Sequence, residues 1–355
     1  MTAKRHVALS SGRKADASIV AEVRALIVSA RKTVATVVNA SLTTLYWQIG
    51  TRIRRDILRE KRAGYGEEIL HTLSTKLSAE FSRGFSLRNL AWMVRLAEIF
   101  PNQKIVATLS RELGWSHFRE LLPLNKPHQR DFYAEMCRLE RWSVRTLRRQ
   151  IDGMPYERTA LSKKPAKLIE KELTALRTDG KLTPDLVFKD PYVLDFLGLR
   201  DTYSEKDLET AILRDIERFL LELGAGFAFV ERQKRIVIDG EDFHLDLLLF
   251  HRRLRRLVLV ELKLRAFKAA DFGQTTLYLR WLDRHERQPG EEPPIGLILC
   301  AGKADERIEL LELESSGIRV AQYLTELPPK EILERRFHEA IVAARARLAA
   351  GSTRP

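Results

Sequence analysis

Apolar residues in the first half of the chain recur at helical spacing. From Asp16 to about Arg59 they fall three or four positions apart and no proline interrupts them, which predicts one long helix or two in line. Residues Glu67 to Phe81 predict a second amphipathic helix. Residues Leu87 to Phe100 predict a third, capped by Ser86 and stopped by Pro101. The N-terminal half is therefore expected to be all helical.

The second half alternates between helical and strand-like patterns. A long helix is predicted from Leu208 to Leu223, and Asp239-Gly240 predicts a tight hairpin turn. A helix, three meandering strands, a second helix and further strands together predict an α/β layer structure. The other predicted elements are strands at Phe227–Val230, Lys234–Ile238, Phe243–Phe250, Leu257–Lys263, Ile295–Cys300 and Ile318–Tyr323 and helices at Ala269–Asp283 and about Lys330–Leu348.

Changes in composition divide the chain into four parts. A basic and proline-bearing stretch follows Pro155 and ends near Glu205, as is typical of a connector. We expect a helical domain at 1–155, a connector at 156–204, an α/β domain at 205–327, and a C-terminal helix and tail at 328–355.

The net positive charge of the chain comes entirely from its N-terminal part. Residues 1–155 hold 27 Lys and Arg against 14 Asp and Glu, whereas the remaining 200 residues hold 34 of each. Basic side chains gain affinity for phosphate backbones by releasing condensed counterions. The pattern therefore favours a polyanion-binding module attached to a separate working domain, with a merely solvated basic surface as the alternative.

A short turn between two predicted helices is compatible with a helix-turn-helix. The turn spans Ser82 to Ser86 and contains a glycine, and the second helix carries Arg88, Asn89 and Arg95 as candidate DNA contacts. Ordinary pairing of two packed helices explains the pattern equally well.

A second pair of candidate DNA contacts lies further along the chain. Arg145 and Arg149 share a face at i, i+4 of the helix predicted from Ser143 to Gln150, so they could straddle phosphates. A solvated helix face is the equal alternative.

Several classes of protein are not expected. The apolar runs are far shorter than the roughly 20 residues that span a bilayer, and the start of the chain has no apolar block of a signal peptide. We expect a protein of the cytoplasm with no membrane association. Cys137 and Cys300 lie in separate halves, which favours neither a disulfide nor a thiolate metal site.

Three ionisable residues lie in strands that otherwise read as core. Asp246 falls inside the strand from Phe243, and Glu261 and Lys263 end the next strand. An unpaired charge in such surroundings is costly, so the three groups at adjacent strand ends indicate a metal site with oxygen ligands. A structural acid with a surface Glu–Lys pair is the alternative.

These residues carry a resemblance. Asp246, fourteen intervening residues and then Glu261-Leu262-Lys263 match the D…(D/E)xK pattern of the PD-(D/E)xK nuclease superfamily. With the segments 219–247 and Gly273-Gln274 that frame it, the second half resembles the YhcG family of predicted nucleases. Leu245 stands where many members of the superfamily carry a proline.

The resemblance extends to the first half. The segments Trp115-Ser116-His117-Phe118 and Trp142-Ser143 are similar to the helical N-terminal domain of that family. The fold that this implies is an all-α N-terminal domain followed by an α/β domain like that of restriction endonucleases.

The resemblance also implies a division of roles at the site. Asp246 and Glu261 would be metal ligands, joined by the backbone carbonyl of Leu262, and Lys263 would position or deprotonate the attacking water. Alternation along a strand places Glu261 and Lys263 on one face and Leu262 on the other. The implied cofactor is Mg²⁺, for which Mn²⁺ is expected to substitute.

Four further residues are candidates for the same site. Glu209 resembles a helix acid that adds a metal contact, although a solvated carboxylate is nearly as good an explanation. Gln274 and Tyr278 are similar to the QxxxY element of exonuclease-like members and share a helix face at i, i+4. His244 shares the strand face of Asp246, and a packed histidine is the preferred interpretation.

The sequence thus predicts a Mg²⁺-dependent DNA nuclease that acts in repair, recombination or defence against foreign DNA. The alternative is a DNA-binding or assembly protein that keeps the fold without turnover, and RNA is an alternative substrate. A homodimer is left open, with the C-terminal helix as one surface for it.

Overall fold

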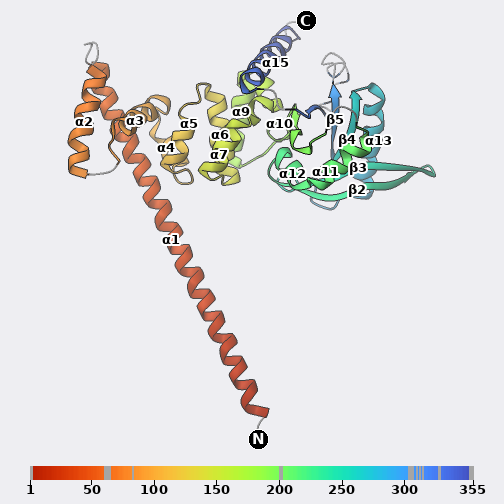
Figure 1. The fold of residues 1–355 in the computed structure, drawn as a ribbon, viewed down its shortest axis with the longest axis horizontal. Helices are drawn as coiled ribbons and strands as arrows, with labels where there is room; N and C mark the ends of the chain where they lie inside the picture. The colour runs from red at the N-terminus through yellow and green to blue at the C-terminus, as the bar shows by residue number, and fades with distance from the viewer. Residues whose placement is uncertain are drawn as a thin grey trace. The chain divides into compact units, whose positions relative to one another are not determined.

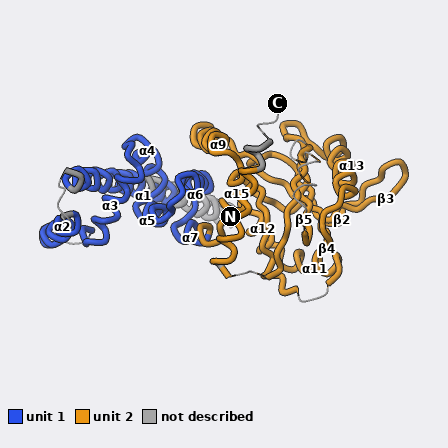
Figure 2. Tube along the Cα trace, turned by 90° about the horizontal axis from the view of Figure 1, so that it is seen from above, with its two compact units in different colours: residues 1–149 blue, residues 150–355 orange. Residues whose placement is uncertain are grey.

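The computed structural model forms two compact units, residues 1–149 and 150–355 (Figure 2). The residues that the structure describes are 3–59, 65–81, 84–199, 203–302, 308, 311, 313, 316–326 and 329–351.

The described residues of unit 1 form helices joined by short turns, as predicted (Figure 1). Ser86 caps the third helix, because its hydroxyl accepts a hydrogen bond from the backbone N–H of Asn89 at 3.3 Å. The helices are α1 (Ala3–Arg59), α2 (Tyr65–Phe81), α3 (Leu87–Ile99), α4 (Gln103–Leu109), α5 (Trp115–Leu121), α6 (Pro127–Glu140) and α7 (Val144–Asp152).

The close approach of α1 and α3 holds unit 1 together. Tyr46 and Ile53 of α1 are buried against Leu90 and Met93 of α3. Gly50 lies at the crossing, where a Cβ atom would stand 1.8 Å from the carbonyl oxygen of Met93. The two backbones therefore touch at a point that only glycine allows.

Several described aliphatic side chains of α1 that precede this crossing stay exposed. Val34 is 62% exposed and Val38 is 57% exposed. The helical spacing of the sequence is confirmed here, but among the described residues no other element covers this face.

Replacing Gly50 by alanine tests the crossing. We expect Gly50→Ala to lower the free energy of unfolding by about 1–3 kcal/mol, because the helices must move apart. Gly273 of helix α13 (Ala269–His285) is the matched control, since a Cβ there meets nothing within 4 Å. Gly273→Ala should be neutral or stabilising by up to about 1 kcal/mol. Urea denaturation of the two variants measures the difference, and equal stability would contradict the close approach.

Unit 2 is built on one six-stranded mixed sheet, with strand order β1-β6-β5-β4-β3-β2. The three strands β2, β3 and β4 form an antiparallel meander, and β4, β5, β6 and β1 pair in parallel. The elements are α8 (Pro155–Arg158), the 3₁₀ turn η1 (Ala160–Lys163), α9 (Ala166–Asp179), α10 (Pro184–Val187), β1 (Tyr192–Val193), the 3₁₀ turn η2 (Asp195–Leu197), α11 (Glu205–Arg214), α12 (Ile216–Leu223), β2 (Phe227–Ile238), β3 (Glu241–His251), β4 (Arg256–Ala266), α13, β5 (Ile295–Gly302), β6 (Ile318–Leu324) and α15 (Lys330–Gly351).

Helices cover both faces of this sheet (Figure 1). On one face α11 and α12 pack against Val258 and Leu297. On the other face α13 packs against Leu259 and Ile298. The hairpin of β2 and β3 turns at Asp239-Gly240, where both residues have positive φ, as the sequence predicts.

The prediction of one helix from Leu208 to Leu223 is wrong. The segment forms two helices, α11 and α12, which meet at Asp215 with φ −110° and ψ 34°. Aspartate favours such a break because its side chain competes for nearby backbone groups. Leu208 and Leu223 still reach the same core cluster.

The segments outside the predicted α/β domain also pack in unit 2. Residues 156–204 supply β1 to the sheet. The C-terminal helix α15, one surface considered above for a homodimer, buries Leu333 and Phe337 against Met154 of its own chain. Among the described residues no helix is both long and apolar enough to cross a membrane.

The buried His251 predicts a pH-dependent stability of unit 2. Its Nδ1 accepts a hydrogen bond from the backbone N–H of Leu254 at 3.0 Å, and burial lowers its pKa from 6.5 to about 4. Because the folded state disfavours the imidazolium, neutral His251 contributes to the stability of unit 2. This contribution is complete above pH 6.5 and is lost as the pH falls to about 4.

We expect the free energy of unfolding to fall by roughly 3 kcal/mol over this range from His251 alone. His251→Asn keeps an acceptor that does not titrate, so its stability should depend less on pH. Urea denaturation between pH 4 and 6.5 measures both slopes, and identical slopes would exclude the role of His251.

Candidate active site

The site forms where strands β3 and β4 part. Their ladder ends at the pair Leu247–Val260, so Asp246 and Glu261 face each other just beyond it. Asp246 Oδ2 accepts a hydrogen bond from the backbone N–H of Leu262 at 2.8 Å, and the backbone N–H of Asp246 points to Glu261 Oε1 at 3.5 Å. The two carboxylates are therefore the acceptors for backbone N–H groups just beyond the end of the ladder.

Lys263 is the cation beside these carboxylates. Its Nζ lies 3.3 Å from Glu261 Oε2 on the face of β4 that alternation predicts. Leu262 is buried on the opposite face, in the cluster beneath α11 and α12. Burial alone would lower the pKa of Lys263, but the charges of Glu261 and Asp246 outweigh it and raise this pKa.

The site has less positive charge than its carboxylates require. Glu261 is only 3% exposed, and burial, followed by the charge of Asp246, raises its pKa to about 7 despite Lys263. Burial also raises the pKa of Asp246, against the N–H of Leu262. A cation bound between the two carboxylates would relieve both effects.

Gln233 is a member of the site that sequence reasoning missed. Its Nε2 donates to Glu209 Oε2 at 2.9 Å and to Asp246 Oδ1 at 3.2 Å, so it bridges two acids. The two short runs predicted at 227–238 are one strand, β2, with a register shift after Phe229. Gln233 has φ 45° within this strand. This is a strained conformation for a residue other than glycine, and the sequence pattern does not predict it.

Helix α11 supplies two acids rather than the single one predicted. Glu209 reaches the site through Gln233, and its pKa is raised by burial and then by Asp246. Glu205 lies one helical turn earlier, and its Oε1 accepts a hydrogen bond from the backbone N–H of Leu264 at 3.2 Å. The charge of Glu205 also raises the pKa of Asp246. The i, i+4 spacing of the two acids could have indicated this pair.

Helix α13 supplies the predicted amide and phenol. Gln274 Nε2 donates to the hydroxyl of Tyr278 at 2.7 Å. Burial raises the pKa of Tyr278, and the charges of Glu261, Lys263 and Asp246 also act on its hydroxyl. The pair therefore belongs to the same electrostatic environment as the acids.

Two predicted side chains are placed differently. His244, for which a packed position was preferred, is exposed on β3. Asn89 is not free for DNA, because its amide donates to the carbonyl of Gly84 and accepts from the indole of Trp115 at 3.0 Å. Its role is to join α3 to α5.

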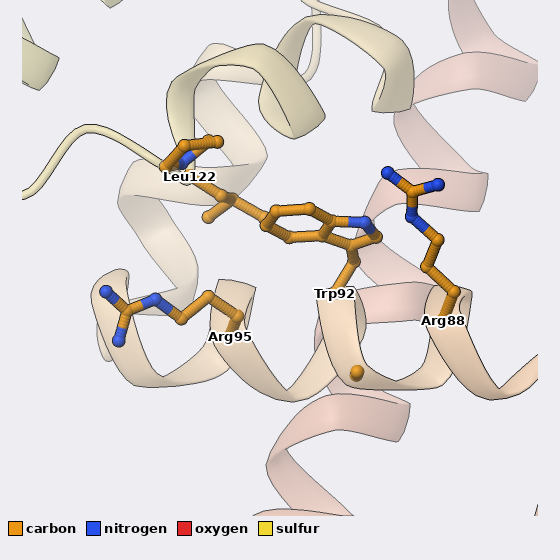
Figure 3. Close-up of a pocket in the computed structure, with 6 residues that line it drawn as sticks. Arg88, Trp92, Arg95 and Leu122 are labelled. Carbon is orange, nitrogen blue, oxygen red and sulfur yellow. The ribbon is translucent and has the colours of Figure 1, made fainter.

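The predicted arginines all lie in unit 1. Arg88 and Arg95 line a cavity beside Trp92 on α3 (Figure 3). Arg145 and Arg149 are exposed on α7, while Arg148 between them is paired with Glu120. Both pairs are thus accessible to a ligand of unit 1.

No group of three or more His, Cys, Asp or Glu side chains in the described part of the chain is arranged to hold a metal ion. The donor set at β3 and β4 nevertheless fits one. Asp246 and Glu261 present hard carboxylate oxygens, which Mg²⁺ prefers, and Glu261 is buried beside Asp246 with Lys263 as its neighbouring cation.

An aspartate and a Glu-x-Lys meeting at the parting of two antiparallel strands, in a mixed sheet covered on both faces, define a domain of the PD-(D/E)xK nuclease class. Residues 185–338 match the YhcG PDDEXK nuclease domain, and residues 22–158 match the DUF1016 N-terminal domain. The chain belongs to the YhcG family.

A relative in Escherichia coli (strain K12), named "Putative nuclease YhcG", is 37% identical over 360 residues, which cover 93% of this chain and 94% of the relative. Two solved structures are also similar, a repair endonuclease from Pyrococcus abyssi and EndoMS in its apo form. They share 22% and 19% identity with this chain, each with a TM-score of 0.25. Each match covers 37% of this chain and about half of the other, 50% and 49% respectively.

Removing the bridging amide of Gln233 tests its place in the site. Gln233→Leu leaves Glu209 and Asp246 without their shared donor, so we expect the metal-free protein to lose about 1 kcal/mol of stability. Saturating Mg²⁺ should recover more thermal stability in this variant than in the unsubstituted protein, because the cation replaces the donor.

The matched control is Gln288→Leu, since among the described residues the side-chain amide of Gln288 donates only to the backbone carbonyl of Glu286. Thermal unfolding in EDTA and in Mg²⁺ measures both variants. If the two variants respond alike to Mg²⁺, Gln233 is not a bridge between site acids.

Proposed function

We propose that the protein is a divalent-metal-dependent DNA nuclease that hydrolyses phosphodiester bonds. The observation that carries this proposal is the meeting of Asp246, Glu261 and Lys263 where β3 and β4 part. Two buried carboxylates with one ammonium leave a net negative site, which suits a divalent cation and then a phosphate. Membership of the YhcG family supports the same reaction class.

The proposed metal ligands are Asp246, Glu261 and the backbone carbonyl of Leu262. The N–H of Leu262 points to Asp246, and the N–H and C=O of one strand residue point to the same side, which supports the carbonyl as a ligand. Mg²⁺, or Mn²⁺ in its place, would supply a polarised water and a counter-charge for the phosphate. Glu209 is the further candidate ligand.

Lys263, Gln274 and Tyr278 are assigned to the water and the substrate and not to the metal. The ammonium of Lys263 lies 3.3 Å from Glu261, so we assign it to orienting the water and offsetting the charge that develops on the phosphate. Gln274 and Tyr278 are proposed to contact the substrate beside the metal. Their mutual hydrogen bond fixes the orientation of the phenol.

Binding of DNA is assigned largely to the N-terminal part of the chain. Residues 1–155 carry the entire excess of positive charge, and Arg88, Arg95, Arg145 and Arg149 are the proposed contacts. The helices α2 and α3 are compatible with a helix-turn-helix, and the α/β part is assigned to cleavage. Repair, recombination or defence against foreign DNA is the proposed setting.

Asp246→Asn tests the reaction. The amide keeps the shape of the side chain but not its charge, so we expect metal-dependent nicking of plasmid DNA to fall more than about 100-fold while DNA binding is retained. The matched control is Asp242→Asn on the same strand, where the acid is exposed and paired with Arg235 at 2.8 Å. Asp242→Asn should keep full activity.

The assay runs with Mg²⁺, Mn²⁺ or EDTA on plasmid, branched DNA and labelled RNA. Cleavage of RNA alone would change the substrate class. Absence of metal-dependent cleavage on every substrate, with DNA binding intact, would establish the non-catalytic alternative.

A further inference from the structure

Helix α3 presents an aromatic residue between two arginines on the side away from its core. Arg88, Trp92 and Arg95 are spaced i, i+4 and i+7, which at 100° per residue places them within about 60° of arc. Leu90 and Met93 point to the opposite side and pack against α1. The stripe is therefore not needed for the packing of α1 on α3.

A cavity of about 410 Å³ lies along this stripe (Figure 3). Its volume falls within the range of small-ligand pockets, roughly 300–1,000 Å³. Figure 3 shows Trp92 between Arg88 and Arg95, with Leu122 approaching the indole from another segment. Ala91 and Pro123 complete the wall. The cavity is thus apolar in its middle and positively charged at both ends.

The charges at the two ends are available to an anion. Arg88 is exposed and has no partner among the described residues, while Arg95 makes one exposed pair with Glu98 at 2.9 Å. Burial lowers the pKa of Arg130, the charge of Asp131 opposes this shift and the charge of Arg95 adds to it, so a third guanidinium is near. These arginines favour an anionic partner over an apolar one.

Trp92 itself has an unmet requirement. Its Nε1 is buried and finds no acceptor among the described residues, and buried donors in proteins are almost always paired. Leu122 packs at the indole ring (Figure 3). An aromatic face with adjacent guanidinium groups is the arrangement on which single-stranded bases stack.

We propose that this cavity holds one unstacked base of DNA against Trp92, with Arg88 and Arg95 on the phosphates to either side. The two arginines stand roughly 10 Å apart along the helix, which leaves room for a base between them. The inference rests on the proposed DNA nuclease function and deepens it. It names as the preferred substrate a duplex that contains an unpaired base.

The test uses the full chain with Asp246→Asn, without metal, so that DNA is bound but not cut. The probes are a fully paired duplex and the same duplex with one extrahelical 2-aminopurine. We expect about tenfold tighter binding of the second probe, the size of a single base–aromatic stack, together with quenching of the 2-aminopurine fluorescence.

Two substitutions in the cavity should remove that preference and leave the affinity for paired duplex unchanged. Trp92→Leu removes the stacking face. Ala91→Phe fills the cavity from an exposed position, so it tests the same point without touching the core.

A third pair of variants tests the charges. Arg88→Gln should weaken binding of the extrahelical probe more than Arg111→Gln, an exposed arginine of the same unit that does not line the cavity. The equal change in charge controls for general counterion release.

Equal binding of the two probes by the chain with Trp92 intact would overturn the proposal, as would unchanged quenching in both cavity variants. Nuclease activity is decided separately, by cleavage of fully paired plasmid with Asp246 intact. Cleavage without a preference for unpaired bases would contradict the base-binding cavity but not the nuclease function. Absence of both DNA binding and cleavage would contradict both proposals.

Discussion

The burial of Glu261 beside Asp246 is the constraint on which the rest of unit 2 depends. Two carboxylates held together out of water repel each other and resist ionisation, which the raised pKa of Glu261, about 7, expresses. Several nearby donors stabilise these carboxylates: the N–H groups of Leu262 and Asp246, the ammonium of Lys263 and the side-chain amide of Gln233. The parting of β3 and β4 makes room for these groups.

The two units divide the physical requirements of acting on a polyanion. Long-range attraction needs an excess of positive charge, and the N-terminal part of the chain carries all of it. Chemistry on a phosphate needs a few charges held in a fixed geometry, which a sheet with helices on both faces provides. A balanced net charge in the second part of the chain is consistent with that task.

Asp246, Glu261 and Lys263 were predictable because charged residues are unusual in otherwise apolar strands. An acid in an apolar strand has few explanations, and strand alternation correctly placed Glu261 and Lys263 on one face. Gln274 and Tyr278 were singled out by their resemblance to a QxxxY element, and their i, i+4 spacing placed them on one helix face, where they are hydrogen-bonded. By contrast, the break at Asp215 was missed, because the apolar period continues through it and the sequence shows no glycine or proline there.

The sequence by itself determined the periodic elements, the location of the charge and the acids Asp246 and Glu261, since each depends on residues close together in the chain. Only the tertiary structure decided which distant groups meet. Gln233 joins Glu209, 24 residues away, to Asp246, and Asn89 holds Trp115, 26 residues away, instead of facing DNA. Such contacts depend on strand register and on a backbone with positive φ at Gln233. The spacing of neighbouring residues along the sequence predicts neither of these.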